Sequence, residues 1–287
     1  MIKNKINILR KKFHKYKIDG YIIPKNDDYF SEYAKNDRLK TITKFSGSAG
    51  IAVILKKKNY LFVDGRYTIQ AYQESSKSFN IIEIHKKLPH KVIKNYNLGY
   101  DPSLFTNKTL KKYFAHNNLV SIGQNLIDEI SIFKEKITKP FYSLEKKIVG
   151  ETHQSKISKI ASFLNSKKAD FLFVSAPENV AWLLNIRGHD NPNSPIPNAR
   201  LIIDKHKKIY LISEKTKTFN IIKEKKIKKD QVINNSEFLT IINQLPGRNF
   251  IIDNKTCSIF YENIIKTKFK ILKLNDPIYK LKSIKNM

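Results

Sequence analysis

The sequence predicts an α/β protein built from two tandem copies of one domain. Short apolar runs rich in β-branched and aromatic residues, typical of buried strands, alternate with stretches whose apolar residues recur every three or four positions, as in amphipathic helices. The same succession of elements occurs twice, about 151 residues apart. This offset is much longer than the roughly 20–50 residues of a solenoid repeat. The 287 residues fit two domains of about 140 residues each.

The repeat is carried by residues that match between the two halves. In the first helix of each half, the matching apolar residues are 151 positions apart: Ile6 and Ile157, Leu9 and Ile160, Phe13 and Leu164. Asp101 and Asp253, which follow matching strands, are 152 positions apart. An offset that persists over this length indicates a duplication.

The first half is predicted to begin with an amphipathic helix over Met1–Ile18 and to continue into a sheet. The predicted strands are Tyr21–Pro24, Ile51–Leu55, Tyr60–Val63, Ile81–Ile84, Leu98–Tyr100 and Leu119–Ile122. Asn26–Tyr33 has the N-cap and acidic first turn of a helix start. Arg38–Gly50 is predicted to be a loop that ends in a glycine turn.

The second half opens with a predicted helix over Glu151–Ser166. The strands that follow are predicted at Phe171–Val174, Leu201–Ile203, Ile209–Ile212 and Phe250–Ile252. A second helix starts near Pro177 and ends at Arg187-Gly188. The loop after it, residues 189–197, is rich in proline and asparagine. Irregular but stiff loops often display binding residues, so we expect this loop to do so.

Composition indicates a globular protein. Hydrophobic residues make up 41% of the chain, yet no apolar run approaches the roughly 20 residues of a membrane span. No signal-peptide core follows the basic N-terminus, and the single cysteine, Cys257, excludes a disulfide within the chain. We therefore expect a cytoplasmic protein without a membrane partner.

The formal net charge of +29 has two interpretations. One is nucleic-acid binding through a basic surface. The other is a lysine-rich composition that serves no partner. The basic residues are mostly lysine and are scattered over every segment, whereas readers of base edges rely on arginine. These observations favour the second interpretation.

Most candidate chemistry lacks the residues that it needs. Gly47–Gly50 precedes a strand, whereas phosphate loops precede a helix. Ser46 and Ser48 have no assignable base. The seven histidines are isolated from cysteines and from one another, so no zinc motif is present. Asp27 and Asp28 fit a helix start better than a metal site, and Trp182 is expected in the core.

Two segments keep a functional interpretation beside a structural one. Asp64, Arg66 and Tyr67 surround a glycine at a strand end, and can form a structural turn or an interface. Arg187, Asp190 and Asn193 border or occupy the stiff loop and are candidates for contact with another molecule. An internally hydrogen-bonded loop is the structural alternative.

A resemblance to a known family emerges from these motifs. FSGSAG and FVDGRY in the first half, with ENVAWLLNIRGHDNPNSPIPNA in the second, resemble the two N-terminal creatinase-type domains of three-domain aminopeptidase P, the Xaa-Pro aminopeptidase of peptidase family M24. The similarity covers essentially the whole chain, and the closing LNDPIYKLKSIKN resembles the junction into the family's catalytic domain.

The resemblance implies two domains, each with a mixed, roughly six-stranded sheet flanked by helices. Their expected bounds are residues 1–145 and 146–280, with 281–287 as the start of a missing pita-bread catalytic domain. By resemblance, the two domains hold a homo-oligomer and wall the catalytic cleft. The expected cleft-wall residues are Arg187, His189, Asp190 and Asn193.

The resemblance also implies the chemistry of the parent hydrolase. The family releases an N-terminal residue that precedes proline, with two metal ions, usually manganese, that activate a hydroxide. Its metal ligands lie in the C-terminal domain, so no residue here is expected to be catalytic, to bind a cofactor or to bind a metal. This chain alone is predicted to be an inactive, truncated part of a metalloprotease. Two alternatives remain open: a free-standing interaction protein and a basic nucleic-acid-binding protein.

Overall fold

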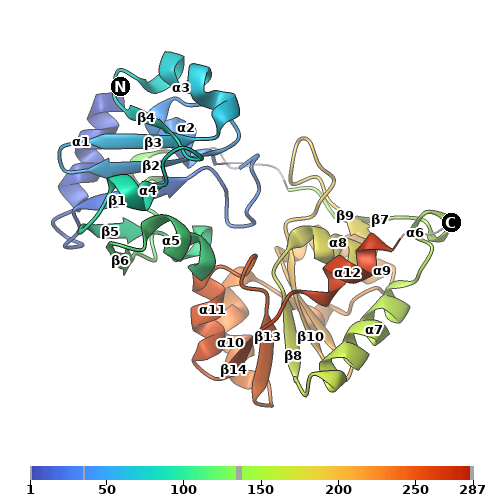
Figure 1. Cartoon of the computed structure of the whole chain (residues 1–287). Coiled ribbons are helices and arrows are strands. Elements are labelled where there is room, and N and C mark those ends of the chain that lie inside the picture. Colours follow the sequence, from blue (N-terminus) through green and yellow to red (C-terminus); the bar gives the residue numbers. More distant parts are fainter. Residues whose placement is uncertain (1, 35, 134–137, 285–287) are drawn as a thin grey trace. The chain divides into compact units, whose positions relative to one another are not determined.

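A computed structural model describes residues 2–34, 36–133 and 138–284 of the chain (Figure 1). The chain forms two compact units, Met1–Glu135 and Lys136–Met287. Each unit has a six-stranded mixed sheet with helices packed on it, which confirms the predicted fold class. No helix in the described ranges combines the length and the apolar character needed to cross a bilayer.

The sheet of unit 1 is organised around strand β1. Its strands are β1 (Gly20–Pro24), β2 (Gly50–Leu55), β3 (Asn59–Val63), β4 (Asn80–Glu83), β5 (Asn97–Tyr100) and β6 (Asn118–Ser121). They lie in the order β4-β3-β2-β1-β5-β6. β1 pairs antiparallel with β2, with Ile22 opposite Val53, and parallel with β5. All five residues of β1 are buried, as a central strand requires.

Helices supply the remainder of the unit 1 core. They are α1 (Ile2–Lys12), α2 (Arg38–Thr43), α3 (Thr68–Ser75), α4 (Pro89–Val92) and α5 (Asn107–Phe114), with short 3-10 turns at Gly65–Tyr67, Pro102–Leu104 and Asp128–Ile130. Ile6 and Leu9 of α1 share one apolar cluster with Leu39 and Ile42 of α2. The predicted helix over Met1–Ile18 is therefore present but stops at Lys12.

The sheet of unit 2 repeats this plan. Its strands are β8 (Phe171–Val174), β10 (Arg200–Asp204), β11 (Ile209–Ile212), β12 (Val232–Ile233), β13 (Asn249–Ile252) and β14 (Lys270–Lys273), and a separate two-stranded sheet joins β7 (Tyr142–Ser143) to β9 (Ile186–Arg187). The order β12-β11-β10-β8-β13-β14 matches that of unit 1 strand for strand. The duplication predicted from the sequence thus extends to sheet topology.

Two layers of helices cover the unit 2 sheet. They are α6 (Lys146–Val149), α7 (His153–Ser166), α8 (Pro177–Leu184), α9 (Phe219–Lys223), α10 (Phe238–Gln244), α11 (Ile259–Lys266) and α12 (Pro277–Ser283), with 3-10 turns at Lys215–Thr218, Lys229–Gln231 and Asn235–Glu237. Leu172 and Val174 of β8 pack in one cluster with α7 and α8, whereas Phe171 and Phe173 pack in the other with α10 and α11. Successive strand residues alternate between faces, which gives the unit its two apolar layers.

A polar network after the fifth strand is duplicated as well. In unit 1, Asp101 Oδ2 accepts a hydrogen bond from Asn125 Nδ2 at 2.9 Å, and Asn125 Oδ1 accepts one from the backbone N–H of Ile127. In unit 2, Asp253 Oδ2 accepts from the backbone N–H of Asp276 at 2.9 Å, and Asp276 Oδ1 accepts from that of Ile278. The four side chains are buried, so these hydrogen bonds satisfy polar groups that lie away from water.

Two local predictions are wrong. Asn26–Tyr33 forms no helix, because Asp27 Oδ1 accepts hydrogen bonds from the backbone N–H groups of Tyr29 and Ser31, both at 2.9 Å, and holds a turn. The predicted loop Arg38–Gly50 contains α2 instead. Asp37 caps this helix by accepting from the Lys40 N–H, and Lys44 ends it in a left-handed conformation.

Candidate functional site

The approach to the proline-rich loop is set by the end of α8. Pro177 lies in the first turn of α8. Val180, Leu183 and Leu184 form the buried face of this helix and pack in the apolar cluster of unit 2. Asn185 ends the helix with a φ of 54°. The chain then forms β9, in which Arg187 pairs with Tyr142 of β7. Because both ends of this segment are held, the loop starts from a fixed position.

The loop itself is held by its own backbone. The Gly188 N–H donates to the carbonyl of Pro195 at 2.9 Å, and Asn191 forms a bridge with Ser194. Gly188 lies so close to Pro197 that an added Cβ would stand 2.8 Å from the Pro197 Cα. A glycine is therefore needed for this close approach.

Asp190 anchors the loop to the body of unit 2. Its Oδ1 pairs with Lys217 Nζ at 2.8 Å, and its Oδ2 accepts from the Asn198 N–H at 2.7 Å. Only 12% of the Asp190 side chain and 7% of the Lys217 side chain are exposed. Burial alone would lower the pKa of Lys217, but hydrogen bonds to Asp190 and Glu214 outweigh it and raise that pKa. Lys217 carries no signal in the sequence, because it is one of many lysines.

His189 and Asn193 are the residues that this loop presents to solvent. Both are exposed, and the His189 ring lies against that of Tyr142 with centroids 5.1 Å apart. They line a pocket of about 470 Å³ together with Lys139, Pro192 and Pro195. Of the three predicted residues in this loop, His189 and Asn193 are exposed, whereas Asp190 holds the loop to unit 2.

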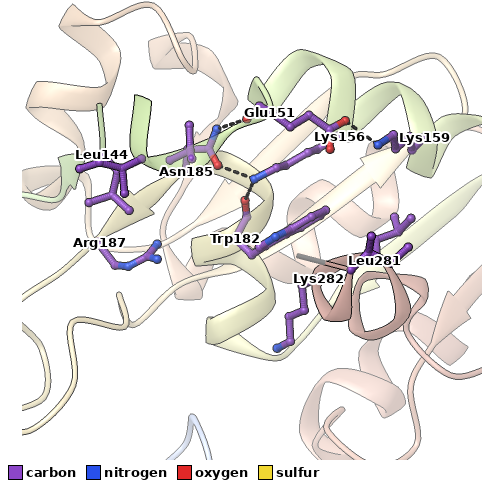
Figure 2. Close-up of a pocket in the computed structure, with 12 residues that line it drawn as sticks. Leu144, Glu151, Lys156, Lys159, Trp182, Asn185, Arg187, Leu281 and Lys282 are labelled. Atoms are coloured by element: carbon purple, nitrogen blue, oxygen red, sulfur yellow. Dashed lines mark hydrogen bonds and ion pairs between the residues drawn. The ribbon is translucent and has the colours of Figure 1, made fainter. Parts of the chain in front are cut away.

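Arg187 faces a different pocket (Figure 2). This pocket has a volume of about 350 Å³, and its wall includes Lys156 of α7, Trp182 of α8 and Leu281 of α12. Arg187 Nη1 donates to the carbonyls of Ile186 at 2.9 Å and Ala181 at 3.4 Å. Trp182, expected in the core, is partly buried at this wall.

The second predicted group, in unit 1, forms a local turn. Asp64 Oδ1 accepts from the Arg66 backbone N–H at 3.0 Å and from Arg66 Nε at 2.8 Å. The hydrogen bond from the Arg66 side chain, followed by that from the backbone, lowers the pKa of Asp64 to about 2. The Tyr67 hydroxyl lies 2.8 Å from that of Ser48, whereas the Arg66 side chain is 70% exposed.

Metal-binding residues do not gather at any of these places. No group of three or more His, Cys, Asp or Glu side chains suited to a metal ion occurs among residues 2–34, 36–133 and 138–284. His85 Nε2 lies 3.4 Å from Asp64 Oδ2, and this pair offers only two metal ligands. Burial raises the pKa of the Cys257 thiol and disfavours the thiolate that binds metals. The described residues thus do not fit a dinuclear metal centre.

Comparisons with known proteins identify similar chains. Two family models described as creatinase/prolidase N-terminal domain match residues 5–130 and 133–287. Xaa-Pro aminopeptidase 2 of Rattus norvegicus is 34% identical over 205 residues, which cover 65% of this chain and 30% of that protein. Xaa-Pro aminopeptidase 1 of Dictyostelium discoideum is 31% identical over 244 residues, or 75% of this chain and 38% of that protein.

A solved structure has the same fold over the whole chain. X-prolyl aminopeptidase from Caenorhabditis elegans, a cytosolic enzyme with a di-nuclear active site, superposes with a TM-score of 0.84 at 24% identity. The match covers all of this chain and 52% of that one. This chain spans about a third of the length of the two relatives above.

Proposed function

This chain belongs to the creatinase/prolidase N-terminal domain family, and we propose from that premise that it forms the two non-catalytic N-terminal domains of an Xaa-Pro aminopeptidase. The observation that carries the proposal is the pair of family matches in tandem, within a chain that is 31–34% identical to Xaa-Pro aminopeptidases. The proposed domains are residues 1–145 and 146–280, with the start of the catalytic domain at 281–287. The contacts of β7 and Leu281 with unit 2 favour the division at Lys136 and a second domain that includes α12. A cytoplasmic location accords with the single cysteine.

The proposed role is to wall the active-site cleft of the aminopeptidase and to shape its oligomer. The proline-rich loop suits a wall, because the buried pair of Asp190 and Lys217 fixes it while His189 and Asn193 remain exposed. A fixed wall admits short, flexible peptide ends and excludes folded chains. The substrates are peptides with proline at the second position. Arg187 is proposed as a further residue of the cleft wall, although its side chain lines another pocket than His189 and Asn193 do.

Hydrolysis itself is assigned to a catalytic domain other than the two domains of this chain. The proposed aminopeptidase would take its hydrolytic chemistry from two divalent metal ions, of which manganese is the family's usual choice. The described residues do not supply ligands for such a centre.

A peptidase assay tests the proposal. The purified 287-residue chain is incubated with manganese and an Xaa-Pro peptide, and release of the first residue is measured. We expect no release above that of a protein-free blank. Sustained turnover that a chelator abolishes would contradict the non-catalytic role.

The cleft-wall role is tested in the aminopeptidase that carries these domains. Asn193→Ala is expected to change the KM for long peptides more than the KM for tripeptides, because only long peptides reach the wall. Arg248→Gln, an exposed substitution elsewhere in unit 2, is the control. If the substitution leaves the KM unchanged for both peptide lengths, the loop does not line the cleft.

A further inference from the structure

The pocket that Arg187 faces has more cationic groups than carboxylates. Lys156, Lys159, Arg187 and Lys282 contribute positive charges to its wall, and Glu151 is the acidic residue that lines it (Figure 2). Glu151 Oε1 pairs with Lys159 Nζ at 2.8 Å. The Glu151 carboxylate therefore already has a cationic partner, whereas Lys156 and Arg187 form no ion pair within the described residues.

Lys156 is a buried ammonium group that forms no ion pair in the described part of the chain, although the charge of nearby Glu151 acts on it. The residue is only 3% exposed. Its Nζ donates to Asn185 Oδ1 at 2.5 Å and to the Trp182 carbonyl at 2.9 Å, and lies 4.1 Å from the centre of the Trp182 ring. These contacts use two of its three N–H groups. A buried cation that is solvated only by neutral groups is costly unless an anion joins it.

The electrostatics of the pocket agree with this geometry. Burial is the largest cause that lowers the pKa of Lys156, to about 8. The charge of Glu151 opposes this shift, and the charges of Arg187, Lys159 and Lys226 add to it. Arg187 donates to two backbone carbonyls through Nη1, and forms no ion pair within the described residues. The fork of its Nε and Nη2 remains able to bind a carboxylate with two hydrogen bonds.

Apolar groups line other parts of the wall. They come from Leu144, Val149 and Leu281, and the Trp182 ring lies beside the buried lysine. The volume of about 350 Å³ lies within the roughly 300–1,000 Å³ of small-molecule sites. A ligand that matches this wall has one negatively charged end and one hydrocarbon end.

We propose that this pocket of unit 2 binds a small organic carboxylate, with the carboxylate between Arg187 and Lys156 and a short hydrocarbon group against Trp182 and Leu281. A charge-assisted hydrogen bond to each cation would offset the cost of burying Lys156. A free branched-chain acid and the C-terminal residue of a peptide share this chemistry. The proposal concerns the 287-residue chain itself and does not depend on the aminopeptidase assignment.

Trp182 makes the proposal directly measurable, because it is the only tryptophan of the chain and lines the pocket. The full chain is titrated with isovalerate at constant ionic strength, with chloride as the balancing anion, and tryptophan fluorescence is recorded. We expect a saturable change, with acetate binding at least tenfold more weakly because it lacks the hydrocarbon group. A leucine-terminated peptide with a free or an amidated C-terminus distinguishes a peptide end from a free acid as the source.

Matched variants assign the effect to the pocket. Arg187→Gln is expected to weaken isovalerate binding at least tenfold, whereas Arg248→Gln, an exposed arginine of the same unit, leaves it unchanged. Circular dichroism verifies that both variants are folded. An unchanged affinity in Arg187→Gln, an equal loss in both variants, or equal binding of phosphate and isovalerate would overturn the proposal.

The rate at which Lys156 is chemically modified in the unsubstituted protein provides a second test of the proposed site. A bound carboxylate raises the pKa of Lys156, so at pH 8 it slows modification of this lysine by an amine-reactive reagent. Peptide mapping by mass spectrometry follows Lys156 and the exposed Lys207 in the same samples. We expect isovalerate to protect Lys156 alone. Equal rates with and without isovalerate would contradict the proposed site.

Discussion

At the scale of single residues, the two units differ most informatively where Asn125 of one corresponds to Asp276 of the other. Both side chains are buried and both accept a hydrogen bond from the N–H two residues later. The amide of Asn125 is neutral at every pH. The carboxyl of Asp276 is not, and burial raises its pKa to about 6, with the nearby Asp253 charge adding to the effect.

This difference predicts a pH dependence for unit 2. Between the ordinary pKa of 3.8 and about 6, native Asp276 keeps a proton that the unfolded chain loses. Its contribution to the free energy of unfolding is therefore largest below the ordinary pKa and is lost as the pH rises to about 6. Over this pH range the loss amounts to about 3 kcal/mol in the free energy of unfolding. Asp276→Asn should abolish this pH dependence.

Urea unfolding at pH 4 and pH 7, followed by Trp182 fluorescence, measures that pH dependence. Asp230→Asn, which alters an exposed aspartate of the same unit, is the control and should retain the wild-type profile. If the Asp276→Asn protein shows the same difference between the two pH values as the wild type, the buried carboxyl is not the titrating group.

At the scale of elements, the central strand β8 supports both apolar layers of unit 2. Phe173 is fully buried and packs against Phe238 and Tyr261, with ring centroids 5.4 Å and 5.2 Å away. We expect Phe173→Ala to lower the free energy of unfolding by about 3–5 kcal/mol, because it leaves a cavity between two helices and the sheet.

Phe219→Ala provides the matched comparison for β8. The Phe219 side chain belongs to the same unit but is 67% exposed, so its removal should change the stability by less than about 0.5 kcal/mol. Denaturant midpoints of the two variants give the result. Similar losses in both would show that burial at β8 does not govern the stability of the unit.

The elements also show how far the sequence predicts this molecule. The central strands and the 151-residue repeat were predictable, because fully buried strands such as Phe171–Val174 are continuous apolar runs. Helix α2 was missed because six residues are too few for a clear period, although Asp37 and the buried pair Leu39 and Ile42 mark it. Asp27 was misread because a side-chain cap serves a turn as well as a helix.

The candidate sites were less predictable than the fold, since they depend on contacts between distant residues. The partner of Asp190, Lys217, is 27 residues away in a lysine-rich stretch. Lys156 lies four residues before Ile160 on α7, so helical spacing places it beside the buried stripe. Its contacts with Trp182 and Asn185, in place of an ion pair, emerge only from the packing of α7 against α8.

At the scale of the whole molecule, each unit has its own core and its own complete sheet. We therefore expect residues 1–133 and 138–284, produced separately, to fold and to unfold cooperatively. Circular dichroism of the two fragments should sum to that of the whole chain. Residues 1–88 are the negative control, because they lack β5 and leave one edge of β1 unpaired. An unfolded 1–133 fragment would show that unit 1 depends on unit 2.

The identical strand order of the two units has a consequence for biosynthesis. Two sheets of one topology on one polypeptide could exchange equivalent strands if both were unfolded at the same moment, and tandem proteins are prone to this error. The ribosome synthesises the chain from its N-terminus, so β6 leaves the exit tunnel before β8 is translated. Every strand of the first copy can thus find its neighbours while the competing strands do not yet exist.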